Sequence, residues 1–172
     1  HLTKILLIIG LGFSLLTGGY LFYLAKTTNV KDLQNALKAT TIIYDKNGDQ
    51  AGSLTGQKGT YVELDAISEN LQNAVVATED RSFYKNSGIN YGRFFLAILT
   101  LGRSGGGSTI TQQLAKNAFL SQDQTVERKA KEFFLALEIN KKYSKKEILT
   151  MYLNNAYFGN GVWGIEDASK KY

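Results

Sequence analysis

The chain opens with a long apolar stretch. Residues 5–25 contain no charged side chain and lie between Lys4 and Lys26. About 20 apolar residues are enough to cross a bilayer as an α-helix, and aromatic residues near the far end suit a membrane interface. A cleaved signal peptide would be shorter and would need a small-residue cleavage site, and the glycines in the stretch disfavour a buried core helix. The pattern therefore predicts a transmembrane helix, followed by a polar juxtamembrane linker over residues 26–40.

Beyond the linker, the pattern predicts a β-hairpin. Residues 41–44 are β-branched or aromatic, which favours a strand, and the Asn47-Gly48 pair is a signal for the turn of a hairpin. The returning strand would cover about residues 50–54. We expect this hairpin to be structural and to join the N-terminal helix to the rest of the chain.

From Ser68 onward, the apolar positions follow a helical period. One face is formed by Leu71, Ala74, Val75 and Thr78. Glu79 follows at the edge of this face, near the end of the helix, so we expect it to be partly buried. Partial burial makes a carboxylate a better proton acceptor near neutral pH. The alternative is a helix-end ion pair with Arg81.

The next two helices enclose a glycine-rich segment. Asn90 can cap a helix over residues 91–101, which is apolar on nearly all sides and is therefore either buried in the core or sunk into a membrane surface. Residues 102–107 follow as a flexible segment, and a new helix begins near Thr109. The first two turns of this helix carry Gln112, Gln113 and Lys116. The stretch is either a loose loop before a polar surface helix or a flap before a binding helix.

The helix predicted over residues 124–143 is apolar on two faces, so we expect it in the core. Arg128 and Glu132 are four residues apart and share one face, and Lys129 adds a second cation nearby. We expect Glu132 to be partly buried beside Arg128, which makes it a second candidate functional carboxylate. A structural Arg–Glu pair is the alternative, because such pairs also perturb carboxylates.

The last part of the chain continues the helical pattern. Ser144 and Glu147 form a capping box that opens another helix, and an aromatic, glycine-rich turn covers residues 157–161. A final helical pattern over residues 164–172 is still running at the last residue, so we expect the natural sequence to continue. Together these elements predict a mainly α fold with a small β-hairpin and an N-terminal transmembrane helix.

The amino-acid composition excludes several kinds of functional site and indicates the charge of a partner. A length of 172 residues suits one domain with a real core. The absence of cysteine excludes disulfides and thiolate metal sites, and a single histidine, at position 1, excludes histidine-based triads. A net charge of +5 and a pI near 9.3 indicate an anionic partner, such as a membrane surface, a nucleic acid or a phosphorylated substrate.

In this order, the segments closely resemble the peptidoglycan glycosyltransferase family, the polymerase module of class A penicillin-binding proteins and of their monofunctional relatives. The resemblance covers roughly residues 41–172, and the family's motifs all appear in sequence. They are matched by residues 79–83, by residues 106–113 with Lys116 and Asn117, by residues 128–132, by residues 145–154 and by residues 157–172. One such motif would be a weak signal, whereas the ordered set makes coincidence very hard to accept.

Two positions depart from the family pattern. The family commonly has His where this chain has Asn86, and Glu where it has Thr150. Neither position is one of the two candidate carboxylates. Asn86 could change the hydrogen bonding around Glu79, and with it the strength of Glu79 as a base.

The resemblance implies a fold, a location and a reaction. The fold would be a lysozyme-like helical domain over residues 41–172, truncated at its C-terminus and held on the extracytoplasmic face of the bacterial cytoplasmic membrane, with residues 1–4 as a cytoplasmic stub. The donor would be a growing glycan on a lipid pyrophosphate, and the acceptor would be lipid II. The partners would then be lipid II, the lipid-linked glycan and the membrane, without nucleic acid.

Residue roles follow from the same resemblance. Glu79 would be the general base that deprotonates the acceptor 4-hydroxyl, and the attack would invert an α-linked pyrophosphate to a β-1,4 bond. Glu132 would be the second essential carboxylate, orienting cations that stabilise the leaving pyrophosphate. The substrate-binding set would comprise Asp80, Arg81, Thr109, Gln112, Gln113, Lys116, Asn117, Arg128 and Lys129, with Asp80 and Arg81 also fixing Glu79.

Two rival functions stay open. A lysozyme-like enzyme that cleaves glycan also uses two carboxylates, and a non-enzymatic membrane scaffold would use the basic surface to bind anionic lipid. The resemblance leaves a divalent metal such as Mg²⁺ or Mn²⁺ at the pyrophosphate open, although no dedicated metal-binding cluster is visible in the sequence. A transpeptidase domain after residue 172, oligomeric state and processivity are equally open.

Overall fold

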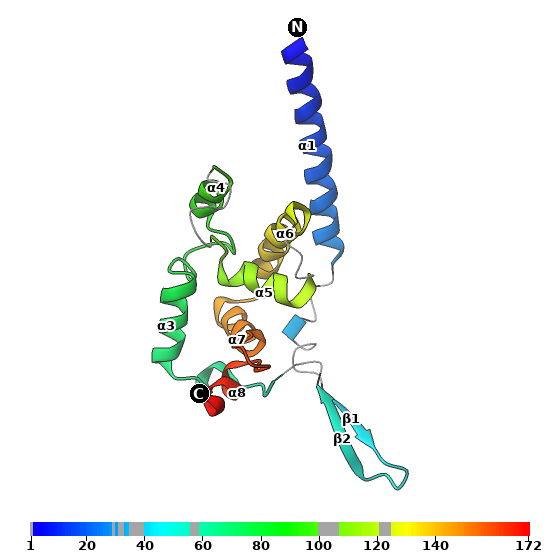
Figure 1. Cartoon of the computed structure of the whole chain (residues 1–172), viewed down its shortest axis with the longest axis vertical. Helices are drawn as coiled ribbons and strands as arrows, with labels where there is room; N and C mark the ends of the chain where they lie inside the picture. Colours follow the sequence, from blue (N-terminus) through cyan, green and yellow to red (C-terminus); the bar gives the residue numbers. More distant parts are fainter. Residues whose placement is uncertain are drawn as a thin grey trace.

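The structure is a computed structural model that describes residues 2–28, 30, 33–34, 40–55, 59–99, 107–120 and 125–172. Within these residues the chain is mainly helical, with a two-stranded antiparallel sheet (Figure 1). The helices are α1 (Leu2–Thr27), α3 (Glu69–Glu79), α4 (Tyr91–Leu99), α5 (Ile110–Phe119), α6 (Val126–Lys142), α7 (Lys145–Asn155) and α8 (Ile165–Lys171), with a 3₁₀ turn at Leu64–Ala66. The predicted mainly α class with a small hairpin is confirmed.

Helix α1 extends away from the other helices over most of its length (Figure 1). By length and composition alone, its segment Thr3–Tyr20 could cross a membrane, and none of that segment is buried against the rest of the chain. The C-terminal end of α1 packs against α6. There the rings of Phe22 and Phe134 meet edge to face at 5.8 Å, and Tyr143 donates a hydrogen bond of 2.7 Å to the carbonyl of Val30.

The hairpin pairs β1 (Thr40–Tyr44) with β2 (Gln50–Thr55) and projects from the helical body (Figure 1). Its turn forms because Asp45 Oδ1 accepts from the backbone N–H groups of Asn47 and Asp49, and because Gly48 adopts a φ of +87° that favours glycine. The predicted hairpin and its Asn-Gly turn are confirmed.

The core lies around α5, α6 and α7. Helix α5 packs against both α6 and α7, so it occupies the centre of the helical body (Figure 1). Its apolar residues Ile110 and Leu114 are fully buried, as are Ile139 of α6 and Ile148 and Leu153 of α7. Burying apolar side chains against one another is the main driving force for this arrangement, and it places the polar first turn of α5 between neighbouring elements.

The predicted buried face of α3 is wrong by about one position. Val76 is buried and Leu71 and Val75 are half-buried, but Ala74 and Thr78 are exposed. The reason is that Asp80, four residues after Val76, is buried by polar contacts that the apolar pattern does not reveal. This rotation leaves Glu79, the last residue of α3, in solvent.

Some expectations fall outside the described residues. They are much of the linker predicted over residues 26–40, the last two residues of the helix predicted over residues 91–101, Gln124, and the flexible segment 102–107 apart from Gly107. Within the described part, Asn90 caps α4 as predicted, because its Oδ1 accepts from the backbone N–H of Arg93 at 3.1 Å.

The capping box of α7 is confirmed and has a measurable consequence. Ser144 Oγ accepts from the Glu147 backbone N–H at 3.3 Å, and Glu147 Oε2 accepts from the Ser144 backbone N–H at 2.7 Å. The hydrogen bond from the Ser144 backbone N–H, and to a smaller extent the nearby Ser144 hydroxyl, stabilise the ionised carboxylate and lower the pKa of Glu147 below its ordinary value. The carboxylate therefore stabilises the fold above the unfolded-state pKa, and this contribution is lost as pH falls through the folded-state pKa.

We expect Ser144→Ala to lower the free energy of unfolding by about 1 kcal/mol at pH 7, because an N-cap hydrogen bond is lost. Urea unfolding of the detergent-solubilised chain measures this change. Ser169→Ala is the matched control, since its hydroxyl donates to the carbonyl of Glu166 on the surface and does not cap a helix. Equal stability of the two variants would contradict the assigned role of the cap.

Candidate active site

Glu79 is held by a side-chain amide from the central helix. It is exposed at the end of α3, and its Oε2 accepts a hydrogen bond of 2.8 Å from Gln113 Nε2 in the first turn of α5. Gln113 Oε1 in turn accepts a hydrogen bond of 3.2 Å from the hydroxyl of Tyr152 on α7. The predicted partial burial of Glu79 is therefore wrong. Among the described residues it forms no ion pair with Arg81, whose Nε instead donates to the carbonyl of Ala77 at 3.1 Å.

Asp80 is buried directly after Glu79 and joins two helices. Its Oδ1 accepts from the backbone N–H of Ser82 at 3.2 Å and from the Ser82 hydroxyl at 2.9 Å. Asn86 Nδ2 donates to both oxygens, at 3.2 and 2.9 Å. Oδ2 also accepts from the backbone N–H of Ile110, the first residue of α5, at 3.4 Å. Asp80 thereby fixes the end of α3 against the start of α5.

Lys145 completes this polar cluster. Its Nζ donates to Asn86 Oδ1 at 3.0 Å and lies 4.8 Å from the centroid of the Phe83 ring, a distance at which a cation is attracted to the ring face. Burial lowers the pKa of Lys145, and the negative charge of Asp80 opposes that change. Asn86 therefore lies between a carboxylate and an ammonium group, with its amide NH₂ toward Asp80 and its oxygen toward Lys145.

The two departures from the family pattern have local roles. Asn86 contacts Asp80, and no hydrogen bond joins it to Glu79 in the described part of the chain. Thr150 is buried in α7, where its hydroxyl donates to the carbonyl of Lys146 at 2.8 Å. Asn86 therefore contacts the residue next to Glu79 rather than Glu79 itself.

The start of α5 is built from Thr109 and Gln112. Thr109 Oγ1 accepts from the Gln112 backbone N–H at 3.1 Å, and Gln112 Oε1 accepts from the Thr109 backbone N–H at 3.0 Å. Thr109 Oγ1 also donates to the carbonyl of Gly88 at 2.6 Å. Gly88 has a φ of +95°, and a Cβ there would lie 2.6 Å from the carbonyl oxygen of Ala136, so a larger residue would clash with α6. Both predicted binding residues are buried in this cap, and their substrate contacts stay a prediction.

Glu132 is buried on α6 and paired with two cations. Arg128 Nη1 lies 3.1 Å from Oε2, and Lys129 Nζ lies 2.5 Å from Oε1. Lys129 Nζ also donates to Ser108 Oγ at 2.6 Å, just before the cap of α5. The predicted pairing of Glu132 with Arg128 is confirmed, and its burial is more complete than expected. Within the described residues, the buried Nε of Arg128 has no hydrogen-bond partner.

The beginning of α5 therefore lies between the two carboxylates. Gln113 contacts Glu79, and Ser108 contacts Lys129, which pairs with Glu132. Lys116 and Asn117 lie further along α5, half-exposed, and their side chains make no hydrogen bond or ion pair with the described residues. An exposed carboxylate, free polar side chains and a cation cluster are thus placed along one short segment. This arrangement can accept a proton and can stabilise an anionic leaving group.

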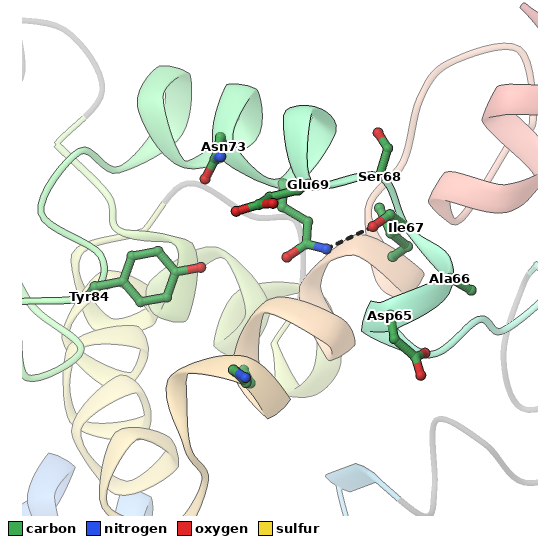
Figure 2. Close-up of a pocket in the computed structure, with 9 residues that line it drawn as sticks. Asp65, Ala66, Ile67, Ser68, Glu69, Asn73 and Tyr84 are labelled. Carbon is green, nitrogen blue, oxygen red and sulfur yellow. Dashed lines mark hydrogen bonds between the residues drawn. The ribbon is translucent and has the colours of Figure 1, made fainter.

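A cavity of about 730 Å³ lies elsewhere, beside the first turns of α3 (Figure 2). Its lining is mostly polar and includes Asp65, Ser68, Glu69, Asn73 and Tyr84. Neither carboxylate of the candidate site lines it. We therefore define the active site by the hydrogen bonds and charges around α5 rather than by this cavity.

The buried carboxylates of the site are already occupied by partners within the protein. Within the described residues, no group of three or more histidine, cysteine, aspartate or glutamate side chains could hold a metal ion. Glu132 already compensates two cations, and Asp80 accepts hydrogen bonds on both oxygens. No step proposed below passes through a protein-bound metal.

Three contacts of the site were missed by sequence reasoning. The Tyr152 hydroxyl reaches Gln113, Ser108 reaches Lys129, and Lys145 reaches Asn86. The phenolic hydroxyl on an otherwise apolar face was an available signal, because a buried tyrosine hydroxyl usually needs a partner. The other two contacts join residues far apart in sequence and leave no local pattern.

The chain is similar to several known proteins. Residues 47–172 match the family model described as transglycosylase. Penicillin-binding protein 2a of Streptococcus pneumoniae serotype 2 (strain D39 / NCTC 7466) is 80% identical over 172 residues, which is 100% of this chain and 24% of that protein. Penicillin-binding protein 1A of Aquifex aeolicus (strain VF5) is 46% identical over 134 residues, or 76% of this chain and 18% of the relative.

A third relative shows the same coverage. Penicillin-binding protein 1F of Bacillus subtilis (strain 168) is 45% identical over 140 residues, which is 79% of this chain and 20% of that protein. The chain thus spans about a quarter or less of the length of these curated relatives.

Proposed function

Because the chain belongs to the transglycosylase family, the peptidoglycan glycosyltransferase module of class A penicillin-binding proteins, we propose that it polymerises lipid II into β-1,4-linked glycan strands. The growing glycan on its lipid pyrophosphate is the donor, and lipid II is the acceptor. The observation that carries the proposal is the placement of Glu79 and the Glu132 cation cluster on either side of the start of α5.

Glu79 acts as the general base in this proposal. It is exposed and can reach a sugar hydroxyl, and within the described part of the chain only its Oε2 has a hydrogen-bond partner. Oε1 is therefore available to take the proton of the acceptor 4-hydroxyl as that oxygen attacks the anomeric carbon of the donor. The C–O bond to the pyrophosphate breaks on the opposite face, so an α-linked donor gives a β-linked product.

The cations stabilise the leaving group. Negative charge builds on the pyrophosphate as the bond breaks, and fixed positive charge nearby lowers the energy of that transition state. Arg128 and Lys129 are held in place by Glu132, and Lys116 adds a half-exposed ammonium group on α5. Gln113 and Asn117 are placed to bind sugar or phosphate oxygens. Thr109 and Gln112 support these contacts by shaping the helix start.

A membrane anchor would hold the active site at the membrane in which a lipid-linked donor resides. We propose that α1 crosses the bacterial cytoplasmic membrane once, with residues 41–172 on the extracytoplasmic face. Its length, its apolar composition and its unburied surface support this role. The aromatic cluster of α4 and α6, in which the Phe94 and Phe133 rings lie 4.8 Å apart beside the exposed Tyr91 and Leu96, suits contact with the membrane surface.

The proposal is tested by incubating the detergent-solubilised chain with fluorescently labelled lipid II. We expect glycan polymer that grows with time and that a muramidase degrades. A heat-denatured sample of the chain is the control. Cleavage of preformed glycan without polymer growth would instead assign the glycan-cleaving function, and binding of anionic vesicles without turnover would assign a scaffold.

A further inference from the structure

A short chain of hydrogen bonds runs from α7 to the proposed base. The Tyr152 hydroxyl lies 3.2 Å from Gln113 Oε1, and Gln113 Nε2 lies 2.8 Å from Glu79 Oε2. It joins the ends of three elements, α3, α5 and α7. Residues 79, 113 and 152 are far apart in sequence, so the fold brings them together.

The chemistry of Glu79 and Tyr152 sets the direction in which these hydrogen bonds are donated. An ionised carboxylate can only accept hydrogen bonds, so Glu79 requires the NH₂ side of the amide. The amide oxygen of Gln113 then points the other way, toward α7, and an oxygen needs a donor. The Tyr152 hydroxyl can donate, whereas the side chains of apolar residues at this position could not.

We propose that Tyr152 is a positioning residue that locks the Gln113 amide with its NH₂ group toward Glu79. The inference rests on the proposed function of Glu79 as the general base. Without the donor on α7, the amide can turn over and present its oxygen to the carboxylate, which repels it. With the lock in place, Oε2 is held and Oε1 is directed to the acceptor hydroxyl.

The surroundings of Tyr152 suit a permanent donor. The residue is 8% exposed. Burial and the negative charge of Glu79 raise the pKa of Tyr152 to about 12. The hydroxyl therefore keeps its proton at every pH at which the enzyme would be assayed, and it cannot switch to an acceptor-only phenolate.

The first test is Tyr152→Phe, which keeps the ring and removes only the donor. We expect kcat for lipid II polymerisation to fall about three- to tenfold, the effect of one net hydrogen bond, with little change in KM. Tyr143→Phe is the matched control. Tyr143 is also 8% exposed and also loses a hydroxyl hydrogen bond, of 2.7 Å to the carbonyl of Val30, which is not a residue of the site. We expect Tyr143→Phe to lower the thermal unfolding temperature similarly and to leave kcat unchanged.

The second test separates the donor role from packing. A ring-fluorinated tyrosine at position 152 keeps the shape of the residue, but its hydroxyl is more acidic because fluorine withdraws electron density. Once ionised, it cannot donate to Gln113. We expect kcat of this protein to fall on the alkaline side at a lower pH than in the chain with ordinary tyrosine, whereas a packing role would leave the two pH profiles superimposed.

The outcomes are distinguishable. If the wild-type chain polymerises lipid II and Tyr152→Phe matches it in kcat, the lock is overturned while the proposed function stands. The same holds if the fluorinated protein has an unaltered pH profile. If the wild-type chain gives no polymer, the proposed function fails and the inference fails with it. A loss of kcat in Tyr152→Phe together with the alkaline fall supports the lock.

Discussion

Glu79→Gln is expected to lower the rate of lipid II polymerisation by at least about 100-fold, the contribution typical of a general base. A glutamine has nearly the same shape as glutamate, but its neutral amide cannot take the proton from the acceptor hydroxyl. Turnover is measured as the initial rate of polymer formation from labelled lipid II at saturating substrate. The expected loss lies in kcat, because the variant keeps the surface that binds the sugar.

The fold should survive this change. Glu79 is exposed, and its contact with Gln113 can be retained by the glutamine oxygen. We therefore expect the thermal unfolding temperature to stay within about 2 °C of the wild type, since exposed substitutions change the free energy of unfolding by about 0.5 kcal/mol or less.

Glu69→Gln is the matched control for the base. Glu69 lies at the other end of the same helix, is also exposed, and does not contact α5 among the described residues. We expect Glu69→Gln to polymerise at the wild-type rate. If Glu79→Gln kept more than about a tenth of the activity, the base would have to be another residue.

Glu132→Gln is expected to damage both stability and activity. The buried carboxylate compensates Arg128 and Lys129, at 3.1 and 2.5 Å. Removing one partner from a buried ionic cluster leaves uncompensated charge and typically costs about 3 kcal/mol. The freed cations also lose the geometry that would support the leaving pyrophosphate, so we expect polymerisation to fall by about 100-fold.

Glu127→Gln isolates the effect of burial. Glu127 lies on the same helix and pairs with Lys131 at 2.6 Å, but its side chain is 62% exposed. Exposed ion pairs contribute little, so this control should change the free energy of unfolding by about 0.5 kcal/mol or less and leave activity unchanged. Urea unfolding and polymerisation are measured on the same preparations, at a temperature at which each variant is folded. Equal behaviour of the two variants would contradict the role assigned to the buried Glu132.

Local rules predicted most helix starts but not the buried face of α3. The capping box of Ser144 and Glu147 and the cap at Asn90 depend on neighbouring residues, so the sequence alone was sufficient to locate them. The environment of Glu79 depends on Asp80, which is buried because Asn86 and Ile110 donate to it. A buried aspartate cannot be recognised from the spacing of apolar residues. The predicted buried face of α3 therefore differed from the observed one.

In the candidate site, too, contacts within one helix were predictable and contacts between helices were not. Arg128, Lys129 and Glu132 lie within two turns of one helix, so their contact followed from spacing. The contacts of Gln113 with Glu79 and of Tyr152 with Gln113 join three separate elements, and only the tertiary packing of α3, α5 and α7 brings them together. Sequence patterns identified the charged residues of the site. The side chains that orient them became visible only in the folded chain.

The contact between α1 and α6 has a consequence for how the enzyme would meet its substrate. The edge-to-face rings of Phe22 and Phe134 attach the end of α1 to the helix that carries Glu132. If α1 spans the bilayer as proposed, this joint sets the height of the cation cluster above the lipid headgroups. A pyrophosphate that stays at its natural depth in the membrane would then meet the cations without being lifted out, and bilayer thickness becomes a variable that controls the rate of strand growth.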